Sequence, residues 1–143
     1  MSKGELENLM NQVVPFAKQM LAKNGEFYPY GGVLTMMGEV ELVGTTDGHG
    51  HPASQELISA LLTVFRQRAN SGKCKATALV ADVRALPSDG DAETSAIQVS
   101  LEHASGLAID VFIPYEIGNE GQIHYGEVFA SQGERIVFLM AED

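Results

Sequence analysis

One short run of the chain combines residue types that bind metal ions: Asp47, His49 and His51, separated by single glycines. Two imidazoles and a carboxylate this close together can hold one divalent transition metal such as Zn²⁺ or Ni²⁺. No cysteine stands near the run, so it offers no thiolate ligand. The run therefore predicts either a metal site at Asp47, His49 and His51 or a solvent-exposed loop. The missing thiolate favours the loop and a protein without a cofactor.

Other candidates for chemistry stand alone. Cys74 lies between Lys73 and Lys75, whose ammonium groups would favour the thiolate, but no spacing ties a histidine to it, and a structural thiol is the favoured interpretation. Glu102 and His103 are neighbours on an expected strand, so their side chains point to opposite faces and form no acid–base pair. The chain has no Gly-x-Ser-x-Gly elbow and no glycine-rich phosphate loop. These observations favour a protein that is not an enzyme.

A cluster of aromatic and methionine residues indicates a contact surface. Tyr28 and Tyr30 alternate along an expected strand, and Met36 and Met37 follow shortly after. Tyrosine suits half-hydrated surfaces, and methionine adapts to differently shaped partners. We predict that the contact surface of the protein, if it has one here, consists of Tyr28, Tyr30, Met36 and Met37. For the aromatic rings themselves, packing over the sheet beneath the first helix is the favoured interpretation, and a partner groove is the alternative.

The spacing of apolar residues predicts two amphipathic helices. Apolar residues recur at three- and four-residue steps from Leu6 to Leu21, which predicts a helix that ends at Asn24-Gly25. Pro15 removes a backbone donor, so it should kink this helix or begin a second one. The same periodicity predicts a second helix over residues 53–70.

The remaining segments alternate as strands do. Polar and apolar residues alternate over residues 39–43, which predicts the second strand of a hairpin that turns near Gly38. Further strands are expected within residues 74–85, 97–102, 107–113 and 123–129, and a last one at 136–140. Short loops make neighbouring strands antiparallel.

We therefore predict a single α+β domain over residues 1–143, with a mostly antiparallel sheet of about five to six strands and two helices on one face. The expected order is α-β-β-α-β-β-β(-β). At the level of fold, this order is similar to the profilin-like and roadblock-like folds, whose helices cover one face of a sheet. Such folds leave room for a small-molecule pocket between the first helix and the sheet.

Charge limits the classes of partner. The chain has a formal net charge of −10, which disfavours nucleic acid and anionic membrane surfaces. A single cysteine allows no internal disulfide, and the first residues lack the pattern of a signal peptide. No apolar run approaches the roughly 18 residues of a membrane helix. We expect a cytoplasmic protein.

Three short motifs carry a family resemblance: Phe27-Tyr28-Pro29-Tyr30-Gly31 after the first helix, Leu101-Glu102-His103, and Pro114-Tyr115. With them the chain resembles a group of small, uncharacterised bacterial cytosolic proteins over most of its length. The resemblance implies a bacterial, cytosolic protein and no established activity.

The leading functional hypothesis is a non-catalytic protein-binding or regulatory domain, which includes self-association as a homodimer. One specific form is an immunity- or antitoxin-like protein whose acidic face covers a basic partner. The rival hypotheses are a metal- or ligand-binding protein or enzyme that uses the His49/His51 loop, and a small-molecule sensor.

Overall fold

The computed structural model describes residues 2–44, 54–85 and 93–138. The elements follow the order α1 (Ser2–Asn24), β1 (Tyr30–Thr35), β2 (Val40–Val43), α2 (Ser54–Asn70), β3 (Cys74–Ala85), β4 (Thr94–His103), β5 (Ala108–Ile117), β6 (Ile123–Tyr125) and β7 (Phe129–Gln132). The predicted order of helices and strands is therefore confirmed, with one strand more than expected.

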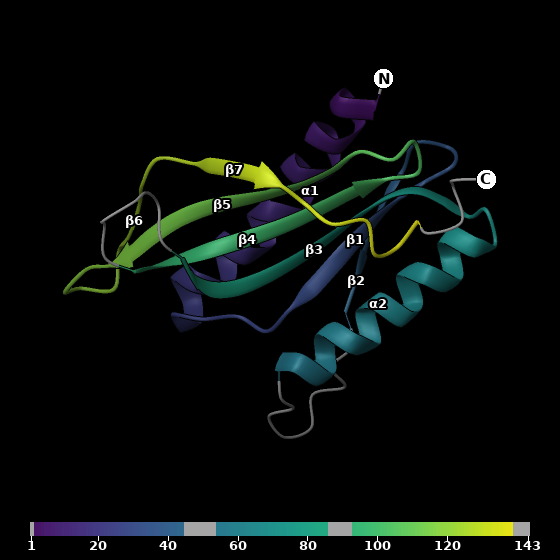
Figure 1. Ribbon diagram of the computed structural model, residues 1–143. Helices are drawn as coiled ribbons and strands as arrows, with labels where there is room; N and C mark the ends of the chain where they lie inside the picture. The colour runs from purple at the N-terminus through teal and green to yellow at the C-terminus, as the bar shows by residue number, and fades with distance from the viewer. Residues whose placement is uncertain (1, 45–53, 86–92, 139–143) are drawn as a thin grey trace.

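The strands form one sheet in the order β2-β1-β3-β4-β5-β6, with β7 also paired to β5 (Figure 1). Every pairing is antiparallel, which confirms the predicted α+β class. The strands β6 and β7 share the outer edge of β5: β7 pairs with residues 109–112, and β6 with residues 115–117. The predicted hairpin turns at Gly38, whose φ of 89° is favourable only for glycine.

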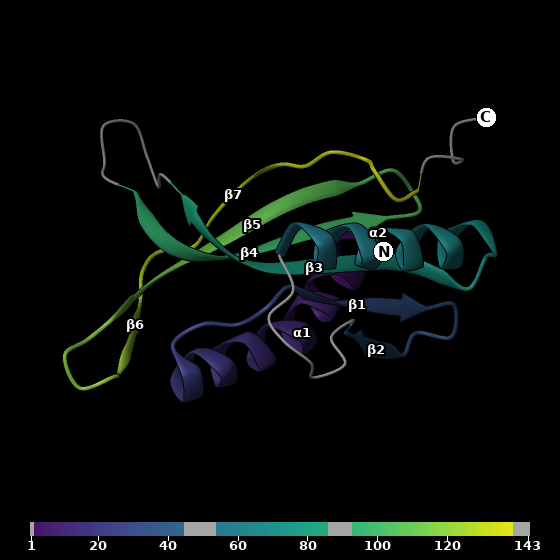
Figure 2. The same cartoon turned by 90° about the horizontal axis from the view of Figure 1, so that it is seen from below.

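The two helices pack on opposite faces of the sheet, which corrects the prediction that both cover one face. Consecutive residues of a strand point to opposite faces. A Cβ atom built on Gly31 would lie 2.4 Å from the Phe65 ring of α2, whereas one built on Gly32 would lie 2.5 Å from Val13 of α1. Figures 1 and 2 show α1 and α2 on the two sides of the sheet. An amphipathic stripe shows that a helix packs its apolar side against the sheet, but it does not show against which face of the sheet.

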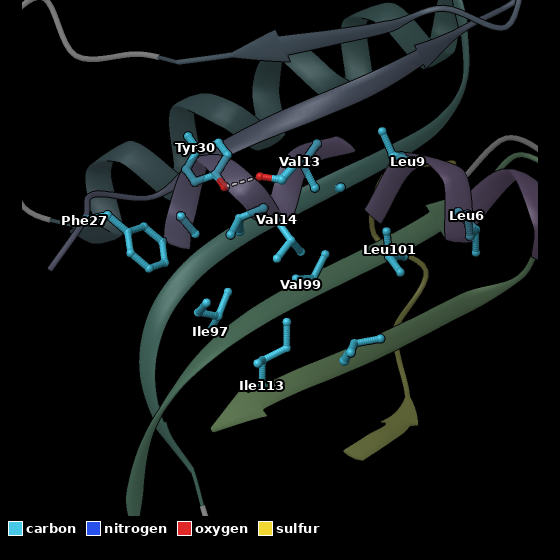
Figure 3. Close-up of a cluster of buried hydrophobic side chains, with 14 of the residues drawn as sticks. Leu6, Leu9, Val13, Val14, Phe27, Tyr30, Ile97, Val99, Leu101 and Ile113 are labelled. Carbon is cyan, nitrogen blue, oxygen red and sulfur yellow. Dashed lines mark hydrogen bonds between the residues drawn. The ribbon is translucent and has the colours of Figure 1, made fainter. Parts of the chain in front are cut away.

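The larger core lies between α1 and the sheet (Figure 3). Leu9, Val13 and Ala17 of α1 are completely buried against side chains of β3, β4 and β5. The helix continues through Pro15 as one element and ends at Asn24; the backbone N–H of the following Gly25 donates to the carbonyl of Leu21. Side chains fill the centre of this interface, and an open hollow lies at its edge between α1 and Leu42 of β2. The ligand pocket between the first helix and the sheet stays a prediction.

A smaller core lies between α2 and the other face, and the C-terminal segment completes it. Phe65 of α2 packs with Val33, Val137 and Phe138, all of them buried. The described part of the predicted last strand, residues 136–138, forms no strand, so that prediction is wrong there. Its backbone is bound by a side chain instead of a neighbouring strand. No helix within the described ranges has the length and apolar character needed to cross a membrane.

Candidate functional site

The predicted metal ligands Asp47, His49 and His51 lie outside the described residues. Of the other two histidines, His103 is buried at the end of β4 and His124 is exposed on β6. Within the part of the chain that the structure describes, no three His, Cys, Asp or Glu side chains are grouped so that they could hold a metal ion. The metal site stays a prediction.

The predicted contact surface does not form one patch. Tyr30 is only 5% exposed, and its hydroxyl donates a hydrogen bond to the carbonyl of Val13 (Figure 3), so it belongs to the core and not to a contact surface. Tyr28, Met36 and Met37 are exposed, Met37 to 86%. Tyr28 precedes β1 and the methionines follow it, so a strand of 6 residues, or roughly 20 Å, separates them. The tip of the β1–β2 hairpin and the start of β1 are therefore separate surfaces.

Cys74 is a structural thiol, as its lack of a histidine partner indicated. Its side chain is 3% exposed, at the edge of the smaller core. Burial raises the pKa of the thiol to about 11, and the positive charge of Arg68 lowers it only in part. The neutral thiol is therefore the stable form at physiological pH, and the chemistry of a thiolate nucleophile is not available to it.

A polar cluster joins the start of α1 to the end of β4. The Nε2 atom of His103 lies 2.7 Å from Oε1 of Glu5, and Nζ of Lys75 lies 2.8 Å from the other carboxylate oxygen. The backbone N–H of Ser105 donates to Nδ1 of His103 over 3.0 Å, so the ring proton is on Nε2 and is donated to Glu5. Both ring nitrogens are thus occupied, and the cluster holds α1 against the β4–β5 turn. Sequence reasoning missed Glu5, which lies 98 residues from His103.

The cluster of Glu5, Lys75 and His103 makes the stability of the fold depend on pH in the acidic range. Hydrogen bonds from Lys75 and His103 lower the pKa of Glu5 to about 2 from 4.5. Because the folded pKa is the lower one, the stabilisation is complete above about pH 4.5 and is lost as the pH falls towards 2. We expect the difference in melting temperature between the wild type and Glu5→Gln to be constant above pH 6 and to shrink towards pH 2. Glu7→Gln, on the exposed side of α1, is the control; an equal pH-dependent difference there would contradict the assignment.

A buried carboxylate on the opposite face binds the C-terminal segment. Glu102 is 3% exposed and accepts hydrogen bonds from the backbone N–H groups of Ile136, Val137 and Phe138, at distances from 2.6 to 3.1 Å. Nε of Arg66 on α2 donates to the carbonyl of Ile136 over 2.7 Å. The prediction that Glu102 and His103 point to opposite faces is therefore confirmed. Glu102 has a structural role, because three backbone donors already occupy it.

A third polar pair closes the far end of the α1 core. The hydroxyl of Tyr115 donates to Oδ1 of Asp82 over 2.6 Å. Burial raises the pKa of Asp82, and burial together with the adjacent carboxylate raises the pKa of Tyr115. Each group satisfies the other, so this pair also serves the fold rather than a reaction.

The described structure also has a cleft beside α2. Its volume is about 210 Å³. The segment after β7 crosses the sheet in front of β4 and runs towards α2 (Figure 1), and the cleft lies between these two walls. Leu62, Phe65, Ile136 and Val137 form the apolar walls, and the sheet contributes polar residues from β3, β4 and β5 to the floor. The cleft therefore lies against the opposite face from the pocket that the sequence predicted.

Charge is distributed unevenly over the sheet. Residues 93–138, which contain β4 to β7, hold seven acidic side chains and one basic one, a net charge of −6. The described residues before them, 2–44 and 54–85, hold seven acidic and eight basic side chains, a net charge of +1. Sequence reasoning used the total charge and missed this asymmetry, which a count by segment reveals. The fold places the acidic strands together at one side of the sheet (Figure 1).

No protein-family model, curated protein or solved structure matches the chain. The resemblance to small bacterial cytosolic proteins therefore stays a prediction, and the function has to be argued from the described geometry.

Proposed function

We propose that the protein is a non-catalytic domain that binds a basic protein through its β4–β7 side. The observation that carries this proposal is the segregation of charge: a net charge of −6 over residues 93–138, against +1 over the described residues before them. A surface of one sign steers partners of the opposite sign and excludes partners of its own sign. It also disfavours self-association through the same surface, so the partner is a different, basic protein.

Exposed apolar side chains accompany these charges. Ile117 at the end of β5 is 48% exposed, and Val128, just before β7, is 53% exposed. Glu116, Glu120 and Glu127 are exposed in the same part of the chain. Apolar contacts surrounded by complementary charges are typical of protein interfaces. An immunity- or antitoxin-like protein that covers a basic toxin is the specific form of this function that the charge favours.

The polar clusters form hydrogen bonds within the domain, which supports a binding function over a catalytic one. The carboxylates of Glu5, Asp82 and Glu102 each have hydrogen-bond partners inside the domain. A general acid or base needs a free position within reach of a substrate. These groups hold helices and the C-terminal segment in place instead.

The test compares two variants of equal net charge. The triple variant Glu116→Lys, Glu120→Lys, Glu127→Lys reverses the acidic side, and Glu7→Lys, Glu26→Lys, Glu39→Lys reverses exposed carboxylates elsewhere. Binding to an arginine-rich peptide of about 20 residues is measured by calorimetry at low and moderate salt. We expect the first variant to lose affinity by tenfold or more and the second by less than threefold, since exposed ion pairs contribute about 0.2–1 kcal/mol each and three of them are lost together. Equal losses would show that only total charge matters and would reject the proposal.

A further inference from the structure

The cleft beside α2 differs from the three polar clusters because two of its carboxylates have no hydrogen-bond or ion-pair partner within the described chain. Asp110 on β5 and Glu134 after β7 both line it. Ion pairs occupy Glu5, Glu41 and Glu93, but no described cation pairs with Asp110 or Glu134. Within the described ranges, the cleft therefore presents two unpaired carboxylates next to an apolar wall.

A buried hydroxyl in the same cleft has no hydrogen-bond partner among the described residues. Thr77 is 2% exposed, lies on β3 between Val33 and Glu102, and lines the cleft. Among the described residues, its hydroxyl makes no hydrogen bond. Leaving a buried polar group unpaired costs about 1–3 kcal/mol, so a hydrogen-bonding ligand that reaches this depth gains by satisfying it. This observation is independent of the acidic residues, and it too indicates a ligand.

The polar floor is rich in acceptors. Ser100 lies directly across the β4–β5 ladder from Asp110, and the side-chain N–H of Gln98 donates to the Ser100 hydroxyl over 3.4 Å. Together with the two carboxylates, these groups suit a ligand with several donors in one plane. Guanidinium has five such donors, and an ammonium group has three donors around a single point. The floor therefore favours guanidinium.

The size of the cleft suits a side chain. A volume of about 210 Å³ is the space of roughly seven water molecules, and a cavity of about 150 Å³ can take a benzene molecule. Most ligand pockets of drug-sized molecules are larger, from about 300 Å³ upwards. Leu62, Leu79 and Ile136 line it and can pack against a three-methylene stem.

We propose that this cleft receives one arginine side chain of the basic partner. The stem packs between α2 and the C-terminal segment, and the guanidinium group binds Asp110 and Glu134. This inference rests on the proposed function and identifies the point on the acidic side where a partner residue is inserted. Buried arginines in such pockets commonly carry a large share of the binding energy of an interface.

Three small probes test the cleft without a partner. Butylguanidinium carries the full head group, butylammonium carries the charge alone, and butylurea has the shape of the first probe without its charge. Binding is followed by amide chemical shifts in ¹⁵N-labelled protein. We expect butylguanidinium to shift the amides of Ser100, Asp110 and Ile136 with a dissociation constant on the order of 1 mM. Butylurea should bind at least tenfold more weakly, and butylammonium should bind more weakly than butylguanidinium. Shifts elsewhere, or equal binding of all three probes, would overturn the proposal.

Matched variants separate this proposal from the previous one. The double variant Asp110→Asn, Glu134→Gln should weaken the binding of butylguanidinium and of the arginine-rich peptide tenfold or more. The double variant Glu116→Gln, Glu120→Gln removes equal charge outside the cleft, so the affinity for butylguanidinium should stay within twofold of the wild type.

The outcomes distinguish the two proposals. If the peptide binds through the acidic side but butylguanidinium neither binds the cleft nor competes, the cleft proposal fails and the proposed function stands. If the peptide does not bind at all, both fail. If butylguanidinium binds the cleft while the peptide does not, the cleft takes a free small cation and the partner-side-chain proposal is rejected.

Discussion

Replacing Glu102 with alanine is expected to lower the free energy of unfolding by about 3–5 kcal/mol. The substitution removes the single acceptor of three backbone N–H groups, those of Ile136, Val137 and Phe138. Val137 and Phe138 are 4% and 6% exposed, so little bulk solvent reaches the N–H groups that lose their acceptor. Urea unfolding at neutral pH measures the change, and amide exchange of residues 136–138 should become faster.

Glu102→Gln and Asp110→Ala are the controls. Glutamine keeps one carbonyl oxygen at nearly the same position, so it should lose less stability than alanine. Asp110 lies on the same face of the sheet but holds no backbone donor among the described residues, so its removal should change stability by about 0.5 kcal/mol or less. A loss of less than 1 kcal/mol in Glu102→Ala would show that the segment is not held by this carboxylate.

Replacing Gly31 with alanine is expected to lower the free energy of unfolding by about 3 kcal/mol or more. The new Cβ would lie 2.4 Å from Cζ of Phe65 and 2.7 Å from the carbonyl oxygen of Ala78. The Phe65 ring is completely buried and the Ala78 oxygen belongs to the neighbouring strand, so neither can move aside easily. Thermal and urea unfolding give the change in stability.

A double-mutant cycle tests whether the helices occupy opposite faces. Combining Gly31→Ala with Phe65→Leu should recover about 1 kcal/mol relative to the sum of the single changes, because the smaller side chain makes room. Val13→Ala should relieve Gly32→Ala in the same way, since Val13 lies 2.5 Å from a Cβ at that position. Relief of Gly31→Ala by Val13→Ala, or of Gly32→Ala by Phe65→Leu, would place both helices on one face and contradict the described packing.

Local order was predictable from the sequence, because local patterns encode it. The stripe from Leu6 to Leu21, the hairpin at Gly38 and the alternation in β4 each depend on residues within a few positions of one another. The class of the fold followed from these elements and their short connections. The structural role of Cys74 was also favoured, since no spacing ties a histidine to it. Its neutral state was not predictable, because the flanking lysines favour the thiolate and only burial in the fold raises the pKa of the thiol.

The face that each helix covers depended on tertiary structure. All but the last residue of β1 are buried, so its pattern shows none of the alternation that distinguishes an inner face from an outer one. Gly31 and Gly32 have no side chains that could indicate a direction, and their small size lets a helix approach closely on each side. Tyr30 packs beneath α1, which confirms the favoured interpretation of the aromatic rings at this residue and excludes it from a contact surface.

The composition of the candidate site was only partly available from the sequence. Its acidic character is a property of residues 93–138 and needs only a count of charges. The cleft itself required the fold, because Thr77, Asp110 and Glu134 come from two strands and a later segment that backbone pairing and the Glu102 anchor bring together. Side-chain types and local spacing are properties of the sequence; contacts between residues 34 to 98 positions apart depend on which surfaces pack together, and only the folded chain decides that.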